Sequence, residues 1–360
     1  MDIKYNRVLI IDGSYMLHRT LSQPNNWDLI NSKGKRTGGI FGVLRSLNKE
    51  LKKYNFYPIV VFDGGLSERR LSLYPNYKRH QDKLLKESTQ DYTEQDLIDM
   101  EFRREYNTQR NDLCELLPWF GIPVIQEPGW EGDDLIYILS KMCKNSIVVS
   151  DDKDLIQLIH QPTEQDNRLC RIWRPLREEF LDYSSLQEKG LDIQEYISCK
   201  SIVGDGSDNI PSACYQVGEK TALGLYNLYK CVNSNNLDFP KDEKELSKLC
   251  EQYNLPKRKA YLNFNENQFL INLNLTDLSL VDDDINEDII SDIKMCILQE
   301  SNVCNNEQYI QELLSDFEIN SFDYSSFRNR VSSLINLLDI ENEDKCENIV
   351  ETNQNTITLF

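Results

Sequence analysis

The chain has 360 residues, of which 40 % are hydrophobic and 28 % charged, so it can bury one large core or two moderate ones. No apolar stretch has the length of a membrane span and the N-terminus lacks a signal-peptide layout, so we expect a cytoplasmic protein without a membrane partner. The formal net charge of −19 by itself argues against a general nucleic-acid binder, because phosphates repel an acidic surface, unless the acids are gathered in one site.

Four short apolar runs predict the buried strands of a mainly parallel sheet. They are residues 8–11, 59–62, 122–125 and 147–149. Between them, residues 38–54 and 133–142 repeat apolar side chains with helical spacing. Strands that alternate with helices indicate an α/β fold.

Residues 66–118 form a segment too long for a simple connection, with helix formers and no strand signal. We therefore predict a helical insertion over one end of the sheet. Its first part is basic in an otherwise acidic chain: Arg69, Arg70, Lys78, Arg79, Lys83 and Lys86 stand against Glu68 and Asp82.

The remainder of the chain is expected to be helical. Beyond residue 172 the pattern becomes helical, which predicts an α/β core at 1–180 followed by a helical C-terminal domain at 181–335. Residues 340–360 are charged and Asn-rich with little to bury, so we expect a disordered acidic tail. The ten cysteines show no CxxC pair and no histidine at zinc spacing, so neither disulfides nor zinc is predicted.

Carboxylates follow every one of the four predicted strands. They are Asp12, Asp63, the group Glu131, Asp133 and Asp134, and the pair Asp152 and Asp154. The carboxyl ends of parallel strands line the crevice where ligands bind, so these groups should converge. One strand-end aspartate is more often a turn or helix cap, but four strand ends with carboxylates are hard to explain in that way.

This set of ligands consists of oxygen atoms only. Without histidine or cysteine it suits Mg²⁺ or Mn²⁺, and seven carboxylates are more than one such ion needs. We therefore infer two ions. A two-metal site activates water and stabilises the attacking and leaving oxygens in phosphodiester cleavage.

Six stretches in order resemble the 5′-nucleases. They read LIIDGSYMLHRT, GGIFGVLRSL, VVFDGG…RR…YPNYKRHQ, WEGDDLIYIL, VVSDDKDLIQL and IVGDGSDNIPSACYQVGEKTAL, and span about residues 7–230. Each is weak alone, but their order is specific. The chain is similar to flap endonucleases, to phage 5′→3′ exonucleases (some named ribonuclease H) and to the 5′-nuclease domain of bacterial DNA polymerases, and looks closest to the phage-type enzymes.

The resemblance implies the two groups of metal ligands. The first would comprise Asp12, Asp63, Glu131 and Asp133, with Asp134 adjacent, and the second Asp152, Asp154, Asp205 and Asp208. Asp151 matches no ligand of the family, so we interpret it as a turn residue.

The resemblance also identifies the basic insertion with the family's helical arch. Tyr77 would stack on an unpaired base and Lys78 would face the scissile phosphate. Arg79 is the candidate for an arginine that the family often carries where this chain has Gln81. Three further bases of the insertion, Arg69, Arg70 and Lys83, are expected to contact DNA.

Residues 196–230 resemble a helix–three-turn–helix element that grips duplex DNA. Main-chain amides of Gly218, Glu219 and Lys220 would bind a phosphate, although an ordinary helix start is the alternative, and Thr221 is a further expected DNA contact. Two of the family's glycines are replaced here, by Ser212 and Gln216, which leaves open whether a monovalent cation binds.

The last residues resemble the short apolar peptides that dock on sliding clamps. Ile357, Leu359 and Phe360 would be the contacts, and a frayed tail is the alternative. A single-strand-binding protein is a second candidate partner.

The combined prediction is a monomeric, metal-dependent 5′→3′ exonuclease and flap endonuclease in replication or repair. Its substrates would be DNA with 5′ flaps, nicks or free 5′ ends, and RNA primers annealed to DNA. One alternative is a catalytically silent binder of branched DNA with the same fold. A PIN-type ribonuclease is another, but such proteins lack the arch and the GDGSDNIP element.

Overall fold

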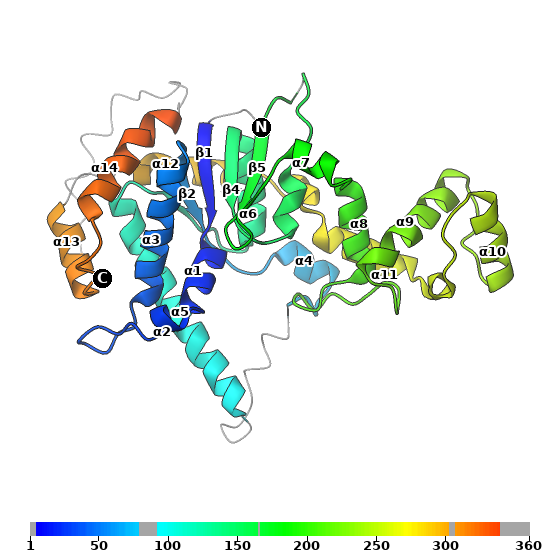
Figure 1. Ribbon diagram of the computed structural model, residues 1–360, viewed down its shortest axis with the longest axis horizontal. Helices are drawn as coiled ribbons and strands as arrows, with labels where there is room; N and C mark the ends of the chain where they lie inside the picture. The colour runs from blue at the N-terminus through cyan, green and yellow to red at the C-terminus, as the bar shows by residue number, and fades with distance from the viewer. Residues whose placement is uncertain (1–4, 79–91, 165, 302–306, 339–360) are drawn as a thin grey trace.

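A twisted, mainly parallel sheet of six strands lies at the centre of the computed structural model, which describes residues 5–78, 92–164, 166–301 and 307–338. The strands are β1 (Tyr5–Asp12), β2 (Tyr57–Val61), β3 (Val124–Ile125), β4 (Cys143–Val149), β5 (Leu169–Arg174) and β6 (Glu179–Leu181). Their order is β3-β2-β1-β4-β5-β6, and only β6 runs antiparallel to its neighbour. The sheet confirms the α/β prediction (Figure 1).

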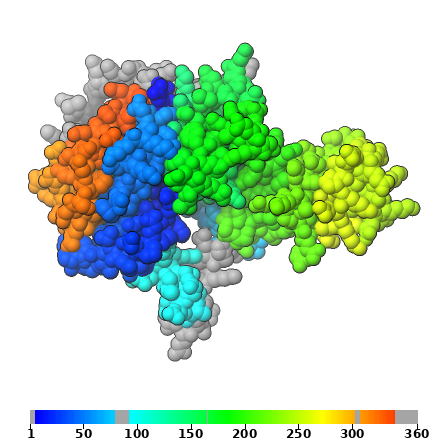
Figure 2. All heavy atoms as spheres, in the orientation of Figure 1, coloured from blue at the N-terminus to red at the C-terminus, as the bar shows by residue number. Residues whose placement is uncertain are grey.

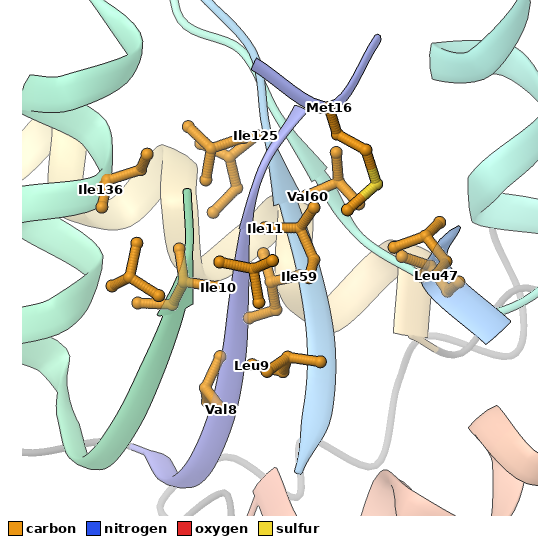
Figure 3. Close-up of a cluster of buried hydrophobic side chains, with 14 of the residues drawn as sticks. Val8, Leu9, Ile10, Ile11, Met16, Leu47, Ile59, Val60, Ile125 and Ile136 are labelled. Carbon is orange, nitrogen blue, oxygen red and sulfur yellow. The ribbon is translucent and has the colours of Figure 1, made fainter. Parts of the chain in front are cut away.

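The central strand β1 is almost wholly buried because helices cover both of its faces. Ile10 pairs with Ile59 of β2 and with Val148 of β4. Figure 3 shows Leu47 of α3 (Gly38–Lys53) on one side of β1 and Ile136 of α6 (Gly132–Met142) on the other. A strand that is buried on both faces needs a continuous apolar run, and this is why β1 could be predicted from the sequence.

The strands β5 and β6 were not predicted, and the expectation of helix directly after residue 172 was wrong. Arg171 and Arg174 interrupt the apolar pattern of β5. Arg174 is nevertheless buried, because Glu179 of the neighbouring β6 accepts a hydrogen bond of 3.0 Å from it. A sequence pattern does not reveal a charge that is neutralised across two strands.

The described part of the 66–118 insertion is helical. It contains α4 (Glu68–Leu73) and α5 (Glu94–Trp119), whose N-terminal end extends away from the body of the molecule (Figure 1). Thr93 and Asp96 form a capping box at the start of α5. Residues 79–91 lie outside the described residues.

A helical module with its own core projects from one end of the molecule (Figure 2). Its helices are α8 (Ile193–Val203), α9 (Glu219–Ser234), α10 (Glu243–Gln252) and α11 (Glu266–Thr276), whereas Leu186 of the preceding α7 (Tyr183–Glu188) packs in the α/β core. Its core includes Ile202, Leu225, Leu228 and Phe269, on α8, α9 and α11. We call α8 to α11, with their connections, the helical module.

The last three described helices pack on the α/β core instead. They are α12 (Glu287–Ser301), α13 (Glu307–Asp316) and α14 (Tyr324–Leu334), and their buried residues join the same hydrophobic cluster as β1 and β2. Two short helices, α1 (Gly13–Leu21) and α2 (Pro24–Trp27), precede α3. The expected helical region 181–335 therefore contributes to two cores. Across the described ranges, no helix is both long and apolar enough to cross a membrane.

Candidate active site

Most of the predicted metal ligands line one cavity at the carboxyl ends of the parallel strands. The cavity has a volume of about 1380 Å³ and contains Asp12, Asp63, Asp133, Asp152, Asp154, Asp205 and Asp208 in its wall. The cavity lies at the end of β1, whose neighbours in the sheet are β2 on one side and β4 on the other. This is the point where the strand order reverses. Glu131 lines a small pocket that shares Asp133, Asp154 and Asp208 with the cavity. Asp134 lines neither.

Asp12 is held at the end of β1 by two hydrogen bonds. One carboxylate oxygen accepts 2.8 Å from the amide of Tyr15, which makes Asp12 the N-cap of α1. The other accepts 2.8 Å from the hydroxyl of Ser150, after β4. Burial, with a contribution from Asp63 and Asp152, raises the pKa of Asp12 to about 7. A nearby cation would therefore favour the charged form.

Asp63 joins three segments at the end of β2. Its carboxylate accepts 2.5 Å from the Ser14 hydroxyl and 2.8 Å from the amide of Gly132, the first residue of α6. A Cβ at Gly132 would stand 3.1 Å from the Asp63 carboxylate oxygen, so glycine permits this close approach. The glycine of the WEGDD stretch is thus explained by the packing of its main-chain amide on a carboxylate.

Asp133 is surrounded by other carboxylates. Burial, together with the charges of Asp152, Asp12 and Asp154, raises its pKa well above the ordinary value. Burial and Asp154 likewise raise the pKa of Asp152. Over the described part of the chain, no hydrogen-bond donor contacts the carboxylate of Asp133. This is an arrangement that a bound cation would stabilise.

Two lysines provide positive charge among these acids. Lys78 contacts Glu131 at 2.7 Å and Asp208 at 3.9 Å. Lys200, on α8, bonds to Asp154 and lies 3.1 Å from Asp205. Lys200 was not predicted. The available signal was its position one turn before the GDGSD stretch, but nothing in the sequence shows that its side chain reaches Asp154 in the segment after β4.

The spacing of the described carboxylates is wider than that of a complete metal-binding group. Within the residues described, no three Asp, Glu, His or Cys side chains are grouped closely enough to hold an ion. Protein donors already bond to several of them, including Ser14 to Asp63, Ser150 to Asp12 and Lys200 to Asp154. The donor chemistry still fits hard divalent cations, because seven of the predicted carboxylate ligands line the cavity and one of them, Asp133, lies among Asp12, Asp152 and Asp154 without a hydrogen-bond donor in the described chain. Binding of an ion would require these side chains to move closer together.

The structure places Arg70 and Asp134 differently from the prediction. Arg70, expected to contact DNA, has only 3 % of its surface exposed. It donates to both carboxylate oxygens of Asp134, at 2.7 and 2.8 Å. Asp134 is therefore the counter-ion of Arg70 and not a free metal ligand. A buried guanidinium requires such a partner, and the sequence does not show that α4 is buried at this position.

Tyr77 and Arg69 also differ from expectation. The ring of Tyr77 is 2 % exposed and its hydroxyl donates 3.0 Å to Glu131, so it offers no free face for stacking on a base. Arg69 donates 2.7 Å to the carbonyl of Asn274 and contacts Asp284 at 2.7 Å, so it faces α11 and not solvent.

Lys78 adopts a positive φ of 54°, and its amide donates 2.9 Å to the carbonyl of Asp208. The segment before residue 79 is therefore docked on the 205–210 loop.

The start of α9 is open to solvent, as the phosphate-binding prediction requires. Gly218 is its N-cap, and Gly218, Glu219 and Lys220 are exposed. In the described chain the amides of these three residues donate no hydrogen bond, while the Gly218 carbonyl accepts from Thr221. Gln216 has a positive φ of 65°, the conformation for which glycine is favoured.

Asp151 also lines the cavity, but its carboxylate bonds to groups that are not predicted metal ligands. Its carboxylate accepts from the hydroxyl of Tyr15 and, at 2.8 Å, from the amide of Leu176 between β5 and β6. These bonds fit the turn role expected for it. The other predicted contacts lie outside the described residues: Arg79, Lys83, and the tail residues Ile357, Leu359 and Phe360.

Comparisons with known proteins identify the family. Residues 7–189 match the profile of the 5′-3′ exonuclease, N-terminal resolvase-like domain. The chain is 31 % identical over 245 residues to the 5′-3′ exonuclease of Buchnera aphidicola subsp. Acyrthosiphon pisum, which covers 66 % of this chain and 76 % of that protein. It is 30 % identical over 243 residues to the 5′-3′ exonuclease of Aquifex aeolicus, covering 66 % and 74 %. The chain belongs to the 5′-3′ exonuclease family.

Solved structures agree on the fold. A complex of the bacteriophage T5 flap endonuclease with DNA and metal ions has a TM-score of 0.56 and 22 % identity, covering 82 % of this chain and 99 % of that one. The T5 5′-exonuclease with bound zinc has a TM-score of 0.55 and 23 % identity, covering 82 % and 100 %. The chain thus has the α/β fold of the 5′-nucleases.

Proposed function

We propose that this chain is a metal-dependent 5′→3′ exonuclease that also cuts 5′ flaps, hydrolysing phosphodiester bonds of DNA. The observation that carries the proposal is the convergence of carboxylates from the ends of β1, β2 and β4, from the start of α6 and from the 205–208 loop at one cavity. Its relatives from Buchnera and Aquifex are 5′-3′ exonucleases.

Divalent cations are required by the charge of the site itself. Asp12, Asp63, Glu131 and Asp133 would hold one ion, and Asp152, Asp154, Asp205 and Asp208 a second. Mg²⁺ or Mn²⁺ bound there supplies Lewis acidity, which activates water and offsets charge on the phosphate. The solved T5 structures contain DNA and metal ions, or zinc, which supports this assignment.

The protein's own groups would position the DNA around this centre. The Lys78 ammonium, with 20 % of its side chain exposed, stands beside Glu131 and Asp208 at the cavity wall, where it can contact the phosphate that is cut. The open amides of Gly218 to Lys220 can bind a phosphate of the duplex beyond the cut. In this arrangement the phosphodiester bond would be cut at the acidic cavity, and the start of α9 would hold the duplex.

Cleavage of a 5′-end-labelled flap substrate with and without Mg²⁺ tests the proposal. Asp152→Ala should lower turnover by at least about 10²–10³, as loss of a charge-stabilising group does, while binding to the same DNA persists. The neighbouring Asp151→Asn is the matched control and should keep cleavage, because Asp151 bonds to Tyr15 and Leu176. Full turnover in Asp152→Ala would refute the mechanism.

The same assay separates the alternatives. A catalytically silent binder would retain the flap complex without Mg²⁺-dependent products, and the presence of all eight carboxylates assigned to the two ions argues against it. An RNA–DNA hybrid with a free 5′ RNA end tests primer removal. Deletion of residues 354–360, followed by measurement of clamp affinity, tests the tail, which lies outside the described residues.

A further inference from the structure

A buried ion cluster joins α4, α6 and α11 behind the carboxylate cavity. Arg70 is its centre, and the function proposed above assigns no role to this residue. Its guanidinium binds both oxygens of Asp134 and lies 3.4 Å from one oxygen of Glu131. Arg70, Asp134 and Glu131 are all buried. Such a cluster cannot take part in surface DNA binding, and its charges persist only because they are paired.

The carboxylate of Glu131 is held from both ends by this cluster and its neighbours. One oxygen accepts 3.1 Å from the amide of Ser67 and faces Arg70. The other accepts from Lys78 at 2.7 Å and from Tyr77 at 3.0 Å. Glu131 is thus fixed in orientation by contacts to both of its oxygens.

Arg70 also reaches the helical module. Its Nε donates 3.0 Å to the carbonyl of Leu275 in the last turn of α11, where helix carbonyls lack partners of their own. Asn272, one turn earlier, donates to the carbonyls of Ser201 on α8 and Pro211 in the α8–α9 connection, at 2.8 and 2.7 Å. One side chain therefore connects a predicted metal ligand with the helix that supports α8.

We propose that Arg70 is a positioning residue that sets the Glu131 carboxylate for divalent-cation binding and locks it to the end of α11. A planar guanidinium can hold two carboxylates and a carbonyl in fixed directions at once, which a lysine cannot do. The proposal rests on the proposed use of Glu131 as a metal ligand. It gives Arg70, which was expected to contact DNA, a role inside the protein instead.

Arg69 offers a matched control on the same helix. It also binds the end of α11, through the Asn274 carbonyl, and it pairs with Asp284, but in the described structure it contacts neither Glu131 nor Asp134. Arg69→Met therefore removes an anchor of α11 and leaves the carboxylates in place. Arg70→Met removes both an anchor of α11 and the guanidinium that contacts the carboxylates of Asp134 and Glu131.

The experiment measures Mn²⁺ affinity by calorimetry on the full chain without DNA, together with thermal unfolding of each variant. Arg70→Met should weaken Mn²⁺ binding about 10–100-fold, as loss of a group that orients a metal ligand does, and Arg69→Met should stay within about twofold. Equal affinity in Arg70→Met and wild type, or equal losses in both variants, would overturn the proposal. If Arg70→Met fails to fold, Arg70→Lys is judged by the same criterion.

A double-mutant cycle then tests whether Arg70 acts through Glu131. In a Glu131→Gln background, Arg70→Met should change Mn²⁺ affinity by less than about threefold, because the group that it orients no longer carries the charge. An undiminished effect in that background would contradict the proposal. Failure of the proposed function looks different, since wild type itself would then bind no Mn²⁺.

Discussion

Single residues in this site act by letting groups approach one another. Gly132 brings its amide to 2.8 Å from Asp63, and Ser14 brings its hydroxyl to the other oxygen of the same carboxylate. Both donors come from the first residues of helices that begin directly after a strand or loop. The carboxylate is therefore oriented by main-chain geometry as well as by its own rotamer.

Gly132→Ala tests this orientation. The new Cβ would stand 3.1 Å from the Asp63 oxygen, so that carboxylate must move by a few tenths of an ångström. We expect Mn²⁺ affinity to fall about tenfold, while the free energy of unfolding changes by about 1 kcal/mol or less because alanine favours the helix. Calorimetric titration and thermal unfolding measure the two effects. Unchanged affinity would show that Asp63 is not held through Gly132.

Among the elements, the C-terminal end of α11 and the N-terminal end of α9 contribute in different ways. The C-terminal end of α11 is fixed to the core, where Arg69, Arg70 and Gln157 donate to three successive carbonyls, those of Asn274, Leu275 and Thr276. The N-terminal end of α9 is instead left open. The helical module is thus anchored at one end and exposes free amides at the other.

Lys220→Ala tests the open end of α9. If the start of this helix binds a duplex phosphate, the variant should weaken DNA binding at low salt and reduce the slope of log affinity against log salt by about one. The exposed Lys248 on α10 provides the control, and Lys248→Ala should leave that slope unchanged. Filter binding or fluorescence anisotropy on a nicked duplex across a salt series measures it. An unchanged slope in Lys220→Ala would exclude this contact.

In the molecule as a whole, the carboxylates that line the cavity repel one another, and a bound cation would reduce this repulsion. The raised pKa of Asp133, caused by burial and by Asp152, Asp12 and Asp154, means that its ionised form opposes folding in metal-free protein. The sign follows directly: an acid with a raised folded-state pKa contributes stability below its unfolded pKa and loses it as the pH rises. Metal-free protein should therefore be less stable at neutral pH than a variant without this charge.

Asp133→Asn makes that expectation measurable. In EDTA at neutral pH the variant should unfold at a higher temperature than wild type. Addition of Mn²⁺ at about 100 times its dissociation constant should stabilise wild type by about 2.7 kcal/mol and the variant by clearly less. Differential scanning calorimetry with and without Mn²⁺ gives both numbers. A variant that gains as much from Mn²⁺ as wild type would place Asp133 outside the ligand set.

The sequence by itself determined the α/β class and the location of the carboxylates, because both follow from local patterns. Strands buried on two faces must be continuously apolar, so β1, β2 and β4 were visible, and an acid directly after such a strand must lie at the carboxyl edge. The tertiary structure decided which charges pair. Arg70 with Asp134, Lys200 with Asp154, and the burial of Tyr77 depend on contacts between segments far apart in the chain, and no spacing in the sequence encodes these distances. Burial makes such pairing obligatory, and only the folded chain establishes what is buried.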